Sequence, residues 1–415
     1  MIDGILALMG SGETSPTMVT VHRDLVARLG VRGPRAVLVE TPYGFQENVA
    51  EISRKAQRYF AQSVGLEVTV APGLRGGSPV DPAANTGADE GLALVRSADW
   101  VFSGPGSPTY ALKTWLPGSI GSALRDRVRA GRGVTLLASA AAATAGRVTV
   151  PVYELYKAGA TPHWAEGLDL TSGLGLRVAV IPHFDNTEGG THDTRFCYLG
   201  ERRLRALEQQ LPDDAAVLGI DEHTAVFINQ STAVVEIVGR GGLTIRRSGS
   251  GTVLPSGTTL TIEDLRALTC GVPSTAVATA PPPPRVELDL VELTAACERR
   301  FDEAVGTRDA PGMVRAVLDL EQAIRDWAED TEEDEGTEKS RAVLRTLIVR
   351  LGEVAAVAVD DPRERLAPIV EPLVVLRGQL RSTRAYSAAD TIRAALGAGG
   401  VRLEDSDEGT RWLVG

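Results

Sequence analysis

The stretch Val134-Thr-Leu-Leu-Ala138, followed at once by Ser139 and four alanines at 140–143, decides the fold of the first half of the chain. Its apolar residues predict a buried strand, and the alanines predict the start of a helix. A serine at such a turn projects from the carboxyl edge of a sheet, and the N–H of Ala140 can stabilise an oxyanion. Ser139 is therefore a candidate nucleophile, although a buried serine at a helix start also fits the pattern.

Strand and helix signals alternate on both sides of this stretch. Apolar runs predict strands at 4–9, 36–40, 67–71, 100–103, 134–138 and 178–182, and amphipathic runs predict helices at 15–29, 48–63, 109–116 and 122–130. Such alternation predicts an α/β fold with a parallel sheet and right-handed crossovers. Alternating Val and Ile within 215–248 predict a short antiparallel addition at one edge of that sheet.

Four consecutive prolines at 281–284 mark a domain boundary, because proline lacks the N–H that a helix or a central strand needs. We expect an α/β domain at 1–277 and a Pro-rich linker at 278–285. Apolar residues with helical spacing then predict a helical bundle at 286–380. A polar, glycine-bearing turn between two short strands predicts a helix and a hairpin at 381–415.

Length and charge bound the function. The 415 residues suggest two or three domains at ~150 residues each, and the net charge is −11. Residues 286–415 hold 27 acidic and 17 basic side chains, so the acidity lies almost wholly in the second half. Binding driven by phosphate contacts depends on Lys and Arg, and this balance argues against it.

The three cysteines at 197, 270 and 297 form no disulfide framework, which favours a cytoplasmic protein. We expect no signal peptide, because the first residues lack a basic segment, and no membrane span, because no run of 18 apolar residues occurs. The sequence predicts no metal site and no cofactor.

Two further motifs supply partners for Ser139. His183 follows a predicted strand, where ligand crevices of open α/β sheets form, and a histidine there can take a proton from a serine. Glu222 lies in Gly219-Ile-Asp-Glu222 and could orient the histidine, with Asp221 as the competing carboxylate. A hydrogen-bonded loop histidine and an exposed polar turn are the alternatives.

The order and spacing of these residues resemble the S51 serine peptidases, which include aspartyl dipeptidases and cyanophycinases. Ser139-Ala-Ala-Ala142, Pro182-His-Phe-Asp-Asn186 and Gly219-Ile-Asp-Glu222 carry the resemblance, which covers about 1–250. It implies a three-layer fold like that of class I glutamine amidotransferases. It also implies a catalytic Ser139, His183 and Glu222, with Arg195 and Asn186 as substrate-binding residues.

Two positions depart from the family's pattern. Its glycine-rich loop, which supplies a second oxyanion donor, resembles Phe102-Ser-Gly-Pro-Gly-Ser-Pro-Thr109, so Gly104 or Gly106 is the expected donor beside Ala140. Pro105 stands where a donating glycine is expected, and Ala141 stands where the family has glycine. These departures keep open a non-catalytic relative that only binds its ligand.

The last 35 residues resemble the C-terminal end of cysteinyl-tRNA synthetases. The matching stretches are Ala389-Asp-Thr-Ile-Arg393, Gly400-Val-Arg-Leu-Glu-Asp405 and Gly409-Thr-Arg-Trp412. The synthetase's His-Ile-Gly-His and Lys-Met-Ser-Lys-Ser signatures are absent, so we expect no activation of cysteine.

Together these features predict a serine-type hydrolase that cleaves a peptide or isopeptide bond, with Asp-linked bonds as a candidate class. The alternative is a non-catalytic S51-like binding protein whose C-terminal module contacts tRNA or a protein. The expected partners are a small peptide or amide substrate and, weakly, tRNA through 381–415. A homo-oligomer stays open.

Overall fold

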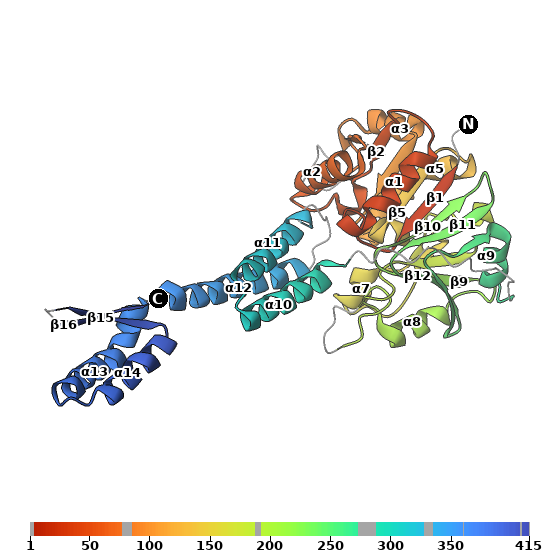
Figure 1. Ribbon diagram of the computed structural model, residues 1–415. Helices are drawn as coiled ribbons and strands as arrows, with labels where there is room; N and C mark the ends of the chain where they lie inside the picture. The colour runs from red at the N-terminus through yellow and green to blue at the C-terminus, as the bar shows by residue number, and fades with distance from the viewer. Residues whose placement is uncertain are drawn as a thin grey trace. The chain divides into compact units, whose positions relative to one another are not determined.

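The strand that precedes Ser139 lies in the middle of a large sheet. The computed structural model describes residues 4–76, 85–186, 192–272, 288–327, 335–359, 361–406 and 409–414. Within these residues the main sheet has eight strands, in the order β14 (Thr259–Thr261), β11 (Val234–Gly239), β10 (Thr224–Asn229), β1 (Ile5–Met9), β5 (Val134–Ala138), β4 (Trp100–Ser103), β2 (Ala36–Leu38) and β3 (Val68–Val70) (Figure 1).

The five strands from β1 to β3 in that order run parallel, so their carboxyl ends meet at one edge. The strands β10, β11 and β14 add to the β1 side in antiparallel pairs. The predicted strands at 4–9, 36–40, 67–71, 100–103 and 134–138 all lie in this sheet. The α/β class predicted from the sequence is confirmed.

A second, six-stranded sheet was not expected. Its order is β13 (Ser250–Pro255), β12 (Gly242–Arg247), β9 (Ala216–Ile220), β8 (Val178–Ile181), β6 (Val148–Thr149) and β7 (Ala165–Glu166). The strand at 178–182, expected in the parallel sheet, is β8 of this second sheet. The antiparallel addition predicted within 215–248 is present as β10 and β11, which extend the main sheet at the β1 edge. The prediction was wrong for the rest of that range, because β9 pairs parallel with β8 and β12 extends the second sheet.

Helices cover both faces of the main sheet. On one face lie α1 (Val19–Arg28) and α2 (Val49–Tyr59), and on the other lie α3 (Ala88–Ser97), α4 (Pro108–Trp115), α5 (Ser119–Arg129), α6 (Ser139–Ala143) and α9 (Ile262–Thr269). Two further helices, α7 (Val152–Tyr156) and α8 (Gly200–Glu208), pack instead with β8 and β9 of the second sheet. Alternate residues of β1 point to opposite faces, so Ile5 and Met9 pack with Leu25 of α1 while Leu6 and Leu8 join the other core.

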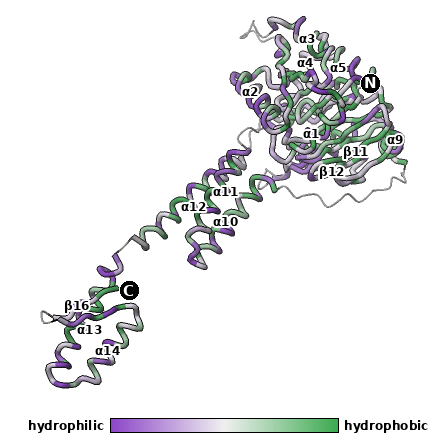
Figure 2. Tube along the Cα trace, turned by 45° about the horizontal axis from the view of Figure 1, so that its top comes forward, coloured by the Kyte–Doolittle hydropathy of each residue, from purple (hydrophilic) through white to green (hydrophobic). Residues whose placement is uncertain are grey.

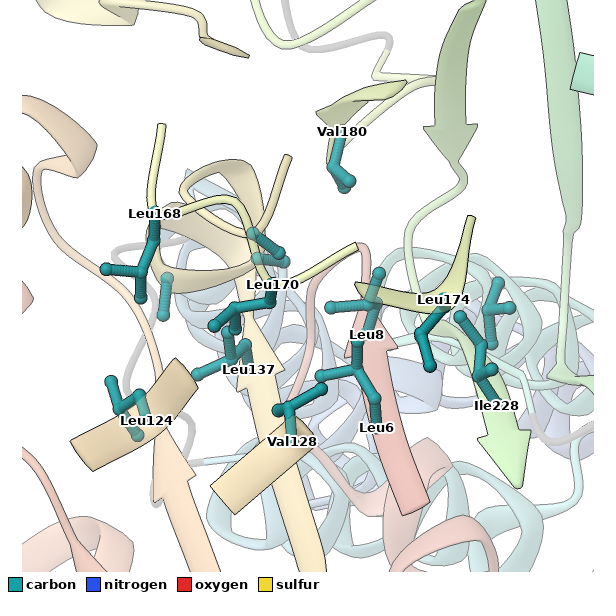
Figure 3. Close-up of a cluster of buried hydrophobic side chains, with 14 of the residues drawn as sticks. Leu6, Leu8, Leu124, Val128, Leu137, Leu168, Leu170, Leu174, Val180 and Ile228 are labelled. Carbon is teal, nitrogen blue, oxygen red and sulfur yellow. The ribbon is translucent and has the colours of Figure 1, made fainter. Parts of the chain in front are cut away.

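The larger core lies between the main sheet and the layer that holds α3, α4, α5 and the second sheet. Leu6, Leu8 and Leu137 meet Leu124 of α5 and Val180 of β8 there, as Figure 3 shows. Burial on both faces explains why the parallel strands are almost continuously apolar. The main sheet is thus the middle of three layers.

The second half of the chain is helical up to a terminal hairpin. Its elements are α10 (Leu290–Thr307), α11 (Ala310–Asp326), α12 (Glu335–Val359), α13 (Pro362–Ser382), α14 (Tyr386–Ala398), β15 (Val401–Ser406) and β16 (Gly409–Val414). In Figure 2, hydrophilic and hydrophobic residues alternate along α11 and α12, as expected for amphipathic helices. The hairpin packs Leu403 and Trp412 against Val370 of α13 and Leu396 of α14.

The chain divides into two compact units. One comprises Met1–Leu293 with Gln322–Glu338, and the other comprises Thr294–Glu321 with Lys339–Gly415. The predicted Pro-rich linker at 278–285 lies outside the described residues. The domain limits drawn from the sequence stay predictions.

Candidate active site

Ser139, His183 and Glu222 come together at the carboxyl edge of the sheets. Ser139 Oγ lies 2.9 Å from His183 Nε2, and His183 Nδ1 lies 2.9 Å from Glu222 Oε1. A neutral imidazole with its proton on Nδ1 donates to the carboxylate and leaves Nε2 to accept from the serine. The three side chains therefore form a continuous hydrogen-bonded relay.

Local backbone geometry aims the first two residues. Ser139 directly follows β5 with φ 47°, and His183 follows β8 with φ 48°, both in the left-handed region that side chains other than glycine seldom adopt. Strain of this kind is typical of functional sites. At Ser139 it produces the sharp strand-to-helix turn that projects the hydroxyl.

Glu222 belongs to a turn between β9 and β10 that several bonds hold in place. Its N–H donates to Asp185 Oδ1 at 2.7 Å, and its Oε1 also accepts from Asn186 Nδ2 at 3.2 Å. Gly219 leaves room for the ring of Phe184, because a Cβ at position 219 would lie 2.3 Å from that ring. The loop that carries His183 thus packs directly on the strand that leads to Glu222.

The pKa values of the two neighbouring carboxyl groups favour Glu222 over Asp221 as the ionised partner of His183. Burial raises the pKa of Glu222, but the hydrogen bond and the charge of His183 outweigh it and hold that pKa below its usual range. Burial and the neighbouring Asp185 raise the pKa of Asp221 to about 6. Asp221 Oδ2 instead accepts the N–H of Gly242 at 2.8 Å.

The backbone donors expected for an oxyanion lie beside this relay. Ala140 lies in the first turn of α6, directly after Ser139. The N–H of Ala141 donates to the carbonyl of Gly104 at 3.2 Å, which brings the loop after β4 against the serine turn. Pro105 lies between Gly104 and Gly106 in this loop, and both glycines retain the N–H that proline lacks.

The departure at Ala141 has little effect on the backbone. The left-handed residue is Ser139, whereas Ala141 lies inside α6 at an ordinary helical conformation. An alanine Cβ is therefore accommodated where the resemblance implies glycine.

Asn186 and Arg195, expected as substrate-binding residues, have other partners here. Asn186 is fully buried, and the bond to Glu222 makes it a support for that carboxylate. Arg195 is exposed and pairs with Asp193 through two bonds of 2.9 Å. Asp193 thus occupies the Nε and Nη2 edge of this guanidinium, which a substrate carboxylate would need for the same two-bond pairing.

In the C-terminal unit, a single carboxylate gathers several arginines. Arg377, whose side chain is 2% exposed, binds Asp405 through two bonds of 2.8 Å, and Arg381 adds a third at 2.8 Å. Arg393 lies 3.7 Å from the same carboxylate. These arginines hold the hairpin to α13 and α14, and their charge is shared with Asp405.

The described residues contain no group of three or more His, Cys, Asp or Glu side chains that could hold a metal ion. None of the helices described is both long and apolar enough to cross a lipid bilayer.

Sequence comparison finds relatives for the C-terminal region. The chain is 28% identical over 118 residues to a cysteine–tRNA ligase from Thermosipho melanesiensis, which covers 28% of this chain and 24% of the ligase. It is 33% identical over 151 residues to the ligase from Geobacter sulfurreducens, covering 31% of this chain and 30% of the ligase. The predicted C-terminal resemblance is confirmed, and the chain spans about a quarter of the length of these curated relatives.

No family model matches the chain. Among solved structures, a peptidase from an acI-B1 Actinobacterium is similar, with a TM-score of 0.48 and 22% identity, covering 62% of this chain and 97% of that chain. A second is a putative peptidase E protein from Listeria monocytogenes, with a TM-score of 0.37 and 15% identity, covering 57% of this chain and 98% of that chain. Both similarities lie in the N-terminal part.

Sequence reasoning missed the support around Glu222. Asp185 binds the Glu222 backbone, and His223 packs behind the turn, yet neither was assigned a role. His223 directly follows Glu222 and Asp185 lies two residues after His183, and this proximity in the sequence was the available signal.

Proposed function

We propose that the N-terminal α/β domain is a serine-type hydrolase that cleaves a peptide or isopeptide bond, with Asp-linked bonds as the first class to test. The observation that carries the proposal is the relay of two 2.9 Å hydrogen bonds from Ser139 through His183 to Glu222. A free serine hydroxyl is a poor nucleophile, and a base oriented by a third group activates it.

In the proposed reaction, Ser139 Oγ attacks the substrate carbonyl carbon while His183 Nε2 takes the hydroxyl proton. The N–H groups of Ala140 and of Gly104 or Gly106 stabilise the negative oxygen of the tetrahedral intermediate. The carbon–nitrogen bond then breaks, and His183 gives its proton to the leaving amine.

The acyl group is now an ester of Ser139. Water attacks that ester and loses a proton to His183, the ester bond breaks, and the proton returns to Ser139 Oγ. Glu222 stays ionised throughout and stabilises the imidazolium that forms twice in each cycle.

A fluorophosphonate probe tests the nucleophile directly. The wild-type chain should be labelled covalently, and Ser139→Ala should not. Ser97→Ala is the matched control, because the Ser97 hydroxyl lies on α3 and bonds only the carbonyl of Leu94. Labelling that survives Ser139→Ala would refute the proposed nucleophile, and an unlabelled wild type would favour the alternative of a binding protein.

A further inference from the structure

Behind the catalytic carboxylate lies a second histidine that the proposed reaction does not use. His223 follows Glu222 directly and has φ 51°. Its Nδ1 lies 2.9 Å from Thr17 Oγ1 and 3.3 Å from Ser15 Oγ. A Cβ at Gly12 would lie 2.1 Å from the same nitrogen, so the glycine turn after β1 is shaped to receive this ring.

The same ring also contacts a tryptophan from far along the chain. Trp327, at the end of α11, meets His223 edge-to-face with ring centroids 5.6 Å apart, and it is only 5% exposed. Residues 322–338 belong to the same compact unit as the two catalytic sheets. The imidazole therefore contacts both the segment after β1 and this aromatic side chain.

Arg240 connects the same turn to the start of α10. The N–H of Arg240 donates to the His223 carbonyl at 2.9 Å. Its guanidinium binds Asp289 at 3.2 Å and Glu292 at 2.8 Å, at the start of α10. All of these residues lie in the one compact unit.

We propose that Trp327 and Arg240 are positioning residues for Glu222, so that segments 289–292 and 322–327 keep the catalytic carboxylate aligned with His183. The proposal rests on the hydrolase function proposed above. Glu222 and His223 share one short turn, and a shift of its backbone moves the carboxylate away from His183 Nδ1. Catalysis is sensitive to such shifts, because a misplacement of about 1 Å can cost about a hundredfold in rate.

The test uses the full chain with Trp327→Ala, Trp327→Phe and Arg240→Ala. Arg300→Ala is the matched control, because Arg300 also forms an exposed ion pair with a helix residue, Asp319, in the other unit. The readouts are the rate of fluorophosphonate labelling and the kcat and KM for aspartyl p-nitroanilide, with thermal unfolding recorded for each variant.

We expect Trp327→Ala and Arg240→Ala to lower the labelling rate and kcat about tenfold with KM nearly unchanged. Trp327→Phe should keep most of the wild-type labelling rate and kcat, because phenylalanine can keep the edge-to-face contact with His223. Arg300→Ala should match the wild type.

Folded Trp327→Ala and Arg240→Ala proteins that react at the wild-type rate would overturn the proposal while leaving the hydrolase intact. If Trp327→Ala does not fold, Arg240→Ala decides. An unlabelled wild type would instead refute the proposed function itself.

Discussion

Replacing Glu222 by glutamine tests the relay most sharply. The change keeps the size of the side chain but removes the negative charge that faces His183 Nδ1 at 2.9 Å. If the NH₂ of the new amide faces the ring, His183 must accept at Nδ1, so its proton moves to Nε2 and the ring can no longer accept the proton of Ser139. If the amide oxygen faces the ring, the tautomer is kept, but the imidazolium loses its negative partner.

The expected loss follows from comparable relays. In a Ser-His-Asp triad, the carboxylate-to-amide change lowers kcat about 10⁴-fold. Asn186 favours an acceptor at this position, since it donates to Glu222 Oε1, and the Glu222 side chain is 27% exposed. Both features soften the effect, so we expect a loss of about 10³-fold, or about 4 kcal/mol of transition-state stabilisation.

Asp221→Asn is the matched control, one residue away. An amide oxygen can still accept the Gly242 N–H, so we expect activity within about threefold of the wild type. Because the folded-state pKa of Asp221 is raised to about 6, its ionisation costs stability as the pH rises from about 4 through 6. The asparagine variant should therefore be at least as stable as the wild type at pH 8.

The assay is the hydrolysis of aspartyl p-nitroanilide together with the fluorophosphonate labelling rate, both measured on folded protein. A Glu222→Gln variant that reacts at the wild-type rate would refute the relay. A larger loss of activity in Asp221→Asn than in Glu222→Gln would show that Asp221, and not Glu222, is the carboxylate that supports His183.

Three other perturbations have defined outcomes. Gly106→Ala should lower the free energy of unfolding by about 1–3 kcal/mol and reduce fluorophosphonate labelling, because φ of Gly106 is 125° and the new Cβ would lie 2.2 Å from the Pro42 carbonyl oxygen. An unchanged stability in calorimetry would contradict this. The bond from Arg377 lowers the pKa of Asp405, so the C-terminal unit should lose stability as the pH falls below about 4, seen by circular dichroism, and Asp405→Asn should abolish that dependence. In a filter-binding assay, the full chain should bind bulk tRNA weakly, and the affinity should fall steeply as the salt concentration rises, because the charge of Arg381 is already paired with Asp405. Tight binding that does not depend on salt would contradict this reasoning.

The local elements of the site could be predicted from sequence alone. A short apolar run before Ser139, with small residues after it, is a local pattern, and hydrophobic periodicity acts over a few residues. The same holds for the amphipathic helices after residue 286 and for the polar turn that joins β15 and β16. These features depend on neighbours in the chain, so one sequence suffices to find them.

Tertiary structure alone decided which groups meet. Asp221 and Glu222 are adjacent and chemically alike, and only the path of the turn after β9 sends one to His183 and the other to Gly242. Asn186 binds Glu222 across 36 positions of sequence, and Trp327 reaches His223 from another part of the chain. No local pattern encodes such pairings, because they arise when separate elements pack, and the division of the strands between two sheets escaped prediction for the same reason.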